Sequence, residues 1–471
     1  MDGLECSEIN RSELERTLRI DSEFYSKSAI KVSDMLQSRS HDLLTTFVNV
    51  SDGNHMGISD CFIDEGVPYY RGQDAGAFFI ENSNPICINE KTFELPVMKR
   101  SHLKKGDVIL SIVGTIGSLS LVYSDKSATC SCKLAILRPK AGKSAELLAT
   151  FLRGKYGQAQ ITRFTRGAVQ KGLILEDMDQ LVVPTLGDGI VEAIKNAVQS
   201  AYQIQEKANI HYREAQRTLM NTIGSILVPA ESVSVRNIST SFYTTGRLDA
   251  EYYQPKYDIL FDELKKFSCK RLGGPNGIVN IKKSIEPGSE AYTEDGIPFV
   301  RVSDISKFGI SEPDIKLRSD IIPNPEVLFP PKDTILLSKD GSVGVAYKVE
   351  ATMPIITSGA LLHLKVRDKT EVLPDYLTLV LNSPVVQLQA ERDSNGAIIQ
   401  HWKPSEIENV IIPILDMDTQ KEIAAKVQES FTLRKQSKQL LEYAKQAVEI
   451  AIEQGEGVAL KWLKDKLPVE V

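Results

Sequence analysis

The stretch from Gly187 to Ser225 reads GDGIVEAIKNAVQSAYQIQEKANIHYREAQRTLMNTIGS. Its apolar or small residues recur at alternating intervals of three and four positions, a spacing that gathers side chains onto one face of a helix. These residues are Ile194, Val198, Ala201, Ala208, Tyr212, Ala215, Leu219 and Thr222. The stretch therefore predicts a long amphipathic helix with one face suited to pairing.

The same spacing returns near the C-terminus, each residue 229 positions after its counterpart. The second set is Ile423, Val427, Ser430, Ser437, Leu441, Ala444, Val448 and Ala451. The alternative is a pair of unrelated surface helices, but a shared register over eight positions argues against it. We predict that the two helices pair antiparallel. The residues expected at the helix-pair or subunit interface are Ile194, Val198, Tyr212, Leu219, Ile423, Val427, Leu441 and Val448.

Other motifs also occur twice. Arg19–Tyr25 (RIDSEFY) returns as Arg247–Tyr253 (RLDAEYY), and the Gly66–Asp74 segment returns as Gly296–Asp304. A run ending in Gly114-Thr115-Ile116-Gly117 matches one ending in Gly341-Ser342-Val343-Gly344. Turn-to-strand segments, helical patterns and a strand closed by proline follow in the same order in both halves.

The repeats predict an α/β (α+β) fold in tandem duplication, separated by two long antiparallel coiled-coil helices, with pseudo-two-fold internal symmetry. The expected boundaries are 1–186 for the first globular unit, 187–226 for the central helix and 227–415 for the second unit. The distal helix is expected at 416–455, and residues 456–471 are expected to be a polar C-terminal tail with no assigned role.

The composition is that of an ordinary globular protein, with 471 residues, 42% hydrophobic and 25% charged. The six cysteines form no CxxC pair and no Cys/His cluster, which argues against a zinc site. The N-terminus is polar and acidic, and no run of 18 apolar residues occurs, so we expect a cytoplasmic protein with no membrane association. A net charge of −6 has the wrong sign for a protein that coats nucleic acid indiscriminately.

The sequence contains no catalytic signature that withstands inspection. Gly142-Lys143-Ser144 has the ending of a phosphate-binding loop, but the earlier glycine that such a loop requires falls on Leu137. The Asn/Asp-Pro-Pro-aromatic loop of amine methyltransferases is missing, and so is HExxH. We therefore expect a binding or organising component and not an enzyme.

One stretch has the charge expected for contact with phosphates. Between Leu147 and Leu175 there is no Asp or Glu, whereas Arg153, Lys155, Arg163, Arg166 and Lys171 are present. This predicts an electropositive footprint for nucleic acid, with a solvated helix face as the alternative.

Polar residues beside the repeated motifs are candidates for contacts with DNA. Arg and Gln suit guanine and adenine edges, and glycine loops let backbone N–H groups approach a phosphate. The matched Arg and Asp of the Gly-x-Pro motif could equally form a structural ion pair, and the glycine loops could be tight hairpins only. The Gln170-Lys171 pair is matched here to Gln400-His401. The candidates are Arg71, Gln73, Thr115, Arg163, Arg166, Gln170, Lys171, Arg301, Ser303, Lys339, Asp340, Ser342, Gln400 and His401.

Taken together, the repeated Arg-Ile/Leu-Asp-x-Glu motif, the Gly-x-x-Gly loops and the long helix after each unit resemble the specificity subunit of type I restriction-modification enzymes. The resemblance covers about residues 17–455. It implies two target-recognition domains that read an asymmetric bipartite site on double-stranded DNA. It also implies that the helices dock two DNA adenine methyltransferase subunits, and that ATP-dependent restriction subunits complete the nuclease.

The resemblance implies no cofactor in this chain. S-adenosylmethionine, ATP and Mg are expected in the partner subunits. The other hypothesis is a protein-binding scaffold or a DNA-mimic inhibitor that does not read DNA, and the acid-free stretch speaks against it.

Overall fold

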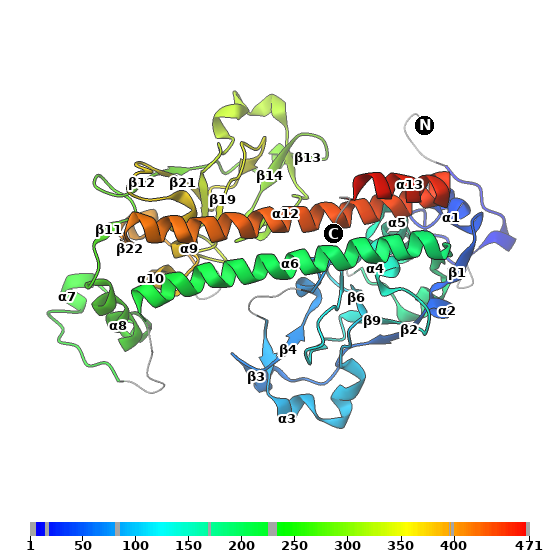
Figure 1. Cartoon of the computed structure of the whole chain (residues 1–471), viewed down its shortest axis with the longest axis horizontal. Coiled ribbons are helices and arrows are strands. Elements are labelled where there is room, and N and C mark those ends of the chain that lie inside the picture. The colour runs from blue at the N-terminus through cyan, green and yellow to red at the C-terminus, as the bar shows by residue number, and fades with distance from the viewer. Residues whose placement is uncertain are drawn as a thin grey trace. The chain divides into compact units, whose positions relative to one another are not determined.

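The computed structural model describes residues 6–14, 18–80, 85–167, 171–224, 233–394, 396 and 400–467 (Figure 1). The chain divides into two compact units. One comprises Met1–Glu206 with Arg434–Val471, and the other comprises Lys207–Leu433. The boundary between the units crosses both long helices. In each helix, one end packs within the first unit and the other end packs within the second unit.

The two long helices are α6 (Asp188–Ile223) and α12 (Met417–Gln454) (Figure 1). In the first unit, Ser437 Oγ donates to the carbonyl of Ala201 at 2.7 Å, and the N–H of Gly187 donates to Glu456 at 3.0 Å. The start of α6 therefore lies beside the end of α12, and the helices run antiparallel, as predicted.

The second unit shows the same direction of pairing. Ser430 Oγ donates to the carbonyl of Ala208 at 2.8 Å, and Lys426 Nζ donates to Thr218 Oγ1 at 3.1 Å. Ser430 and Ser437 are small, as are their counterparts Ala201 and Ala208 in α6, so the helix backbones can approach closely while each buried hydroxyl keeps a hydrogen-bond partner.

Most of the predicted seam is buried. In the first unit it joins Ile194, Val198 and Ala201 with Ala444, Val448 and Ala451, and in the second unit Ala208, Tyr212, Ala215 and Leu219 with Ile423 and Val427. Two positions differ from the prediction. Thr222 is exposed and Ile223 is buried in its place, and Leu441 is only partly buried while the adjacent Leu440 is buried. A straight helix drifts by about 20° per heptad against a strict 3-4 repeat, which moves the buried face by about one residue over this length.

Each unit contains an antiparallel four-stranded sheet of the same order. In the first unit the order is β2-β9-β6-β7, and in the second it is β12-β21-β18-β19. The strands are β2 (Val48–Asp52), β9 (Leu134–Pro139), β6 (Val108–Ser111) and β7 (Leu119–Leu121), then β12 (Val279–Lys283), β21 (Leu361–Val366), β18 (Ile335–Ser338) and β19 (Ala346–Lys348). The inner strands β6, β9, β18 and β21 are nearly continuous buried apolar runs, which fits strands that are covered on both faces. The edge strands β2 and β12 carry exposed polar residues.

A second sheet of short strands is also repeated, in the orders β3-β5-β4-β8 and β13-β17-β14-β20. In each copy one pairing is parallel, between β4 and β8 or between β14 and β20. The strands are β3 (Phe62–Ile63), β5 (Cys87–Ile88), β4 (Val67–Tyr70), β8 (Thr129–Cys130), β13 (Tyr292–Thr293), β17 (Lys316–Leu317), β14 (Ile297–Val300) and β20 (Ile356–Thr357).

A third repeated pairing ends immediately before each long helix. Strand β1 (His41–Leu43) pairs with β10 (Val182–Pro184), and β11 (Cys269–Arg271) pairs with β22 (Ile411–Pro413). These are the predicted strands closed by proline. The hairpin of β15 (Ile305–Ser306) and β16 (Gly309–Ile310) belongs to the second unit.

Helices complete both units. The main ones are α1 (Lys27–Gln37), α4 (Ala145–Arg153) and α5 (Lys155–Phe164) in the first, and α8 (Pro255–Leu264), α9 (Pro374–Leu381) and α10 (Pro384–Asp393) in the second. Short helices are α2 (Leu44–Phe47), α3 (Glu90–Phe93), α7 (Phe242–Thr245) and α11 (Pro404–Glu408). The helical pattern predicted after each glycine loop is therefore two helices, divided at Gly154 and at Ser383.

The predicted C-terminal tail is instead a helix, α13 (Glu456–Lys466). Ala459 and Leu463 are fully buried in the core of the first unit, and Trp462 packs edge-on against Tyr443 of α12 at 5.9 Å. The helix was not predicted because the segment is polar overall and its apolar residues lie on one narrow face. Among the described residues, no helix is long and apolar enough to span a membrane.

Candidate nucleic-acid interface

The structure places the acid-free stretch against carboxylates from other parts of the chain. Lys155 forms an ion pair with Glu453, and Lys171 Nζ lies 3.4 Å from Glu23. Arg166 Nε lies 2.6 Å from Asp177 Oδ2, and its Nη2 donates to Asp177 Oδ1 at 2.7 Å. The predicted electropositive footprint is therefore balanced by acids that lie outside the stretch.

The other two cations of the stretch are structural. Arg153 Nη1 donates to the carbonyls of Leu119 at 2.7 Å and Gly76 at 3.1 Å, and burial lowers the pKa of its guanidinium. Arg163 Nε donates to the carbonyl of Phe24 at 3.0 Å, and its guanidinium carbon lies 4.3 Å from the Phe24 ring centre.

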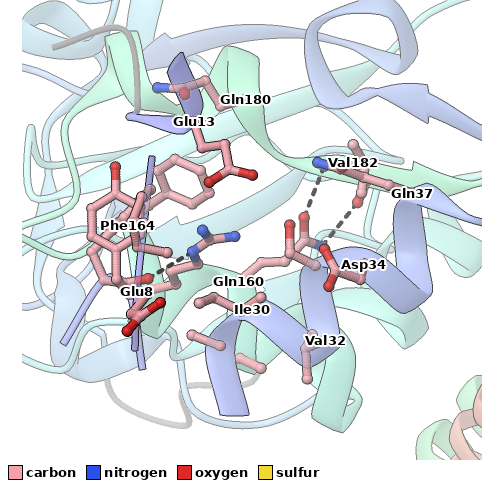
Figure 2. A pocket seen from close by; sticks show the side chains of 17 residues that line it. Glu8, Glu13, Ile30, Val32, Asp34, Gln37, Gln160, Phe164, Gln180 and Val182 are labelled. Atoms are coloured by element: carbon pink, nitrogen blue, oxygen red, sulfur yellow. Dashed lines mark hydrogen bonds between the residues drawn. The ribbon is translucent and has the colours of Figure 1, made fainter. Parts of the chain in front are cut away.

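Arg163 and Phe24 line a cavity of about 490 Å³ between α1 and α5 (Figure 2). The cavity wall also carries Glu8, Glu13 and Asp34, and the side chain of Gln160 forms two hydrogen bonds of 3.0 Å with the backbone of Val182. Three carboxylates around one arginine do not suit a phosphate. Direct phosphate contact by Arg163 is therefore not favoured, because that side chain is committed to the interior of the unit.

Replacing Arg166 with alanine is expected to destabilise the first unit by roughly 2–3 kcal/mol, because Asp177 is buried and would lose its cation. Urea unfolding measures this loss. Arg166→Lys serves as the control, since it keeps the charge but loses the two-pronged geometry. Weaker DNA binding by Arg166→Ala with unchanged stability would instead restore the phosphate interpretation.

The matched Arg and Asp of the Gly-x-Pro motif form the ion pair that the sequence left as an alternative. The N–H of Arg71 donates to Asp74 Oδ2 at 2.8 Å, with Nε at 3.6 Å from the same oxygen. Arg301 and Asp304 repeat this geometry at 2.8 and 3.7 Å. The turn holds Gln73 in one unit and Ser303 in the other, both exposed.

The glycine loops are tight hairpins that connect β6 to β7 and β18 to β19. Gly114 and Gly117 have φ values of 82° and 88°, and Gly341 and Gly344 have 70° and 85°, a region in which glycine is favoured. Thr115 is exposed, and its Oγ1 donates to the carbonyl of Gly72 at 3.1 Å. In the first unit, this contact places the glycine loop directly beside the Arg71–Asp74 turn.

In the second unit, the glycine loop meets a segment that is distant in sequence. Asp340 and His401 form an antiparallel bridge, His401 Nδ1 lies 2.8 Å from Asp340 Oδ1, and the N–H of Gly341 donates to the carbonyl of Gln400 at 2.9 Å. Lys339 forms an ion pair with Asp340. Ser342 is exposed on the same loop. Five of the residues predicted to contact DNA therefore lie together, namely Lys339, Asp340, Ser342, Gln400 and His401.

Lys339, Asp340 and His401 form a polar cluster, of which His401 is the most exposed to solvent. Burial raises the pKa of the Asp340 carboxyl, but hydrogen bonds from Lys339 and His401 outweigh it, and the pKa is lowered. Nδ1 of His401 faces this carboxylate, so Nε2 is the ring nitrogen that is left for another partner. The His401 side chain is 61% exposed, so it can meet a base edge.

Residues 271–443 match the sequence model of the type I restriction modification DNA specificity domain. We call residues 271–443 the specificity domain, after the sequence model that they match. The polar cluster and the second glycine loop both lie inside it, and the resemblance predicted from the repeated motifs is confirmed.

Over most of its length, the chain is also similar to solved structures. The S subunit of a type I restriction-modification system from M. genitalium is 15% identical, with 92% of this chain and 96% of that chain covered and a TM-score of 0.35. The HsdS subunit from Thermoanaerobacter tengcongensis is also 15% identical, with coverage of 88% and 96% and a TM-score of 0.29. No curated protein matches the chain.

The first unit builds the counterpart of the specificity domain's polar cluster from different residues. There the antiparallel bridge joins Val113 to Gly172, and the N–H of Leu173 donates to the carbonyl of Ile112 at 2.9 Å. Gly172 is thus equivalent to His401, and Lys171 to Gln400, one residue away from the predicted match. Gln170 lies outside the described residues.

Ile112, Val113 and Gly172 therefore distinguish the first unit from the specificity domain, and the motifs did not predict them. The offset between the repeats indicates this match, because it is 227 positions from Gly114 to Gly341 and 229 positions from Gly172 to His401. Within the ranges that the structure describes, no group of three or more His, Cys, Asp or Glu residues could hold a metal ion.

Proposed function

We propose that this chain is the DNA-recognition subunit of a type I restriction-modification complex, in which each unit reads one part of a bipartite target. The observation that carries the proposal is the specificity domain at residues 271–443, which exposes Ser342, Gln400 and His401 beside a glycine loop. The first unit repeats its strand order and its bridge, which supports a second reader of the same fold.

The target of such a chain is asymmetric. The second unit places Lys339, Asp340 and His401 where the first has Ile112, Val113 and Gly172. An imidazole and a carboxylate form hydrogen bonds with base edges. At the matching positions of the first unit, Ile112 is buried, Val113 is partly buried and Gly172 has no side chain, so the first unit does not offer these hydrogen bonds there. Two readers with such different chemistry select different base pairs.

The partner subunits would supply much of the affinity for phosphates. The cations of the acid-free stretch are satisfied within the first unit, and the net charge of the chain is −6. Under this proposal, two methyltransferase subunits join the chain, and the restriction subunits join in turn. S-adenosylmethionine, ATP and Mg would be held by those partners.

A gel shift at several salt concentrations tests the proposal. Labelled genomic fragments are mixed with the methyltransferase partner alone and with the partner plus this chain. We expect the chain to add sequence-selective binding, on top of phosphate binding that weakens steeply as salt rises. Identical binding with and without the chain, or no binding at low salt, would favour a scaffold that does not read DNA.

A further inference from the structure

The Arg-Ile/Leu-Asp-x-Glu motif forms the same clamp in both units. In the first unit, Arg19 donates to both carboxylate oxygens of Asp21 at 2.8 and 3.0 Å, stacks 4.4 Å from the Phe24 ring centre and donates to the carbonyl of Thr165 at 3.4 Å. The arginine side chain is only 9% exposed. It therefore fixes the motif to the end of α5.

The second unit repeats every contact of the clamp. Arg247 donates to both carboxylate oxygens of Asp249, from Nε at 2.9 Å and from Nη2, and its guanidinium carbon lies 4.4 Å from the Tyr252 ring centre. Its Nη1 donates to the carbonyl of Asp393, the last residue of α10, at 3.3 Å. A clamp this well determined holds the residue between Arg and Asp in a fixed position.

That residue is apolar and points away from the protein in both units. Ile20 is 85% exposed and Leu248 is 73% exposed. Each is followed three positions later by an exposed acid, Glu23 or Glu251. We call these surfaces the first tip (Leu18, Ile20, Glu23) and the second tip (Leu248, Glu251).

The backbone before the clamp adds an independent sign of function. Leu18 has a φ of 55°, and Gly246, the equivalent residue of the second unit, has a φ of 70°. This left-handed conformation costs a residue with a Cβ of order 1 kcal/mol, which glycine avoids. Leu18 is nevertheless present, and it is 65% exposed, so it contributes no core packing that could offset the strain.

We propose that the two tips are docking points for two copies of one partner protein. Equivalent surfaces on a rigid clamp select the same partner, once per unit. The chemistry of the tip requires an apolar socket flanked by Lys or Arg on the partner, which receives Ile20 or Leu248 and faces the adjacent glutamate. An apolar side chain beside a carboxylate does not suit a DNA backbone. This inference rests on the proposed function, under which the partner is the methyltransferase subunit.

The test titrates the complete chain with purified methyltransferase and counts bound copies by native mass spectrometry. Ile20→Glu should weaken the binding of one copy by about tenfold to a hundredfold, as expected when a buried aliphatic contact is lost. Leu248→Glu should weaken the other copy to a similar extent, and the double variant should weaken both. Because both residues are exposed, circular dichroism of the variants should match that of the unaltered chain.

Matched controls lie on the same units. Val97 and Val327 are exposed valines, one in each unit, at 51% and 68%, and Val97→Glu and Val327→Glu should leave both copies bound. The docking proposal is overturned if the double variant binds two copies with unchanged affinity, or if the control variants lose binding equally. Failure of the unaltered chain to bind any methyltransferase would instead contradict the proposed function itself.

Discussion

Replacing Lys348 with leucine is expected to lower the free energy of unfolding of the second unit by about 3–5 kcal/mol. The Lys348 side chain is only 6% exposed, and Nζ lies 3.0 Å from Asp375, 3.2 Å from Glu350 and 3.8 Å from Asp333. Burial lowers the pKa of Lys348, but the two nearest carboxylates outweigh it, and the pKa is raised. Leucine would leave the buried Asp375 without its cation.

The first unit suggests the control for this experiment. Leu121 occupies the position equivalent to Lys348 in that unit and is fully buried, so the fold accepts an apolar side chain there. A second substitution, Asp375→Leu, added to Lys348→Leu should therefore recover much of the lost stability. Equal destabilisation by the single and double variants would contradict the ion-pair account.

Urea unfolding can report on the second unit alone. The chain has two tryptophans, of which Trp402 is buried in the core of the second unit, whereas Trp462 packs in the first. In a Trp462→Phe background, the remaining fluorescence follows Trp402, and the unfolding midpoint measures the effect of Lys348→Leu directly.

Lowering the pH from 7 to 5 is expected to cost the second unit about 2 kcal/mol through His363, and about 3 kcal/mol below pH 4. Burial, with a smaller contribution from Lys282, lowers the pKa of His363 to about 4. The imidazole is buried, with Nε2 2.8 Å from Thr357 Oγ1. The unfolded chain takes up a proton near pH 6.5 that the folded unit excludes, so stability falls as the pH decreases through this window.

His363→Ile isolates this effect, because Ile136 fills the equivalent position of β9 in the first unit. The variant should lose about 2 kcal/mol less than the unaltered protein between pH 7 and 5, measured by urea unfolding at each pH. The same acid sensitivity in both proteins would show that other groups, such as paired carboxylates, account for it.

Much of the fold could be predicted from the chain because the duplication repeats each signal. The 3-4 spacing of Ile194 and its partners predicted the antiparallel helices, and the recurrence of Gly114 and Gly341 after a strand predicted the two hairpins. Local periodicity and turn chemistry carry both signals. Helix α13 was missed because burial of Ala459 and Leu463 depends on α12, which supplies the surface they pack on.

The candidate site was predicted less completely. The residues around Asp340 and His401 were selected because they differ between the halves, and the structure brings them together. Arg166 and Lys155 pair with Asp177 and Glu453, which lie outside the acid-free stretch, so the charge of the stretch alone did not describe their surroundings. Ion pairs between residues that are distant in sequence leave no local sequence pattern from which they could be predicted. A motif that occurs twice in the chain does leave such a pattern.

The central claim is that two different readers share one fold, and the DNA target itself tests it. Methylation-sensitive sequencing is applied to a host that carries the methyltransferase with the unaltered chain, or with the variant Lys339→Ile, Asp340→Val, His401→Gly, which copies the first unit. The account predicts a bipartite asymmetric target of which the variant changes one part and keeps the other. Changes in both parts, or a methylation pattern unaffected by the variant, would contradict it.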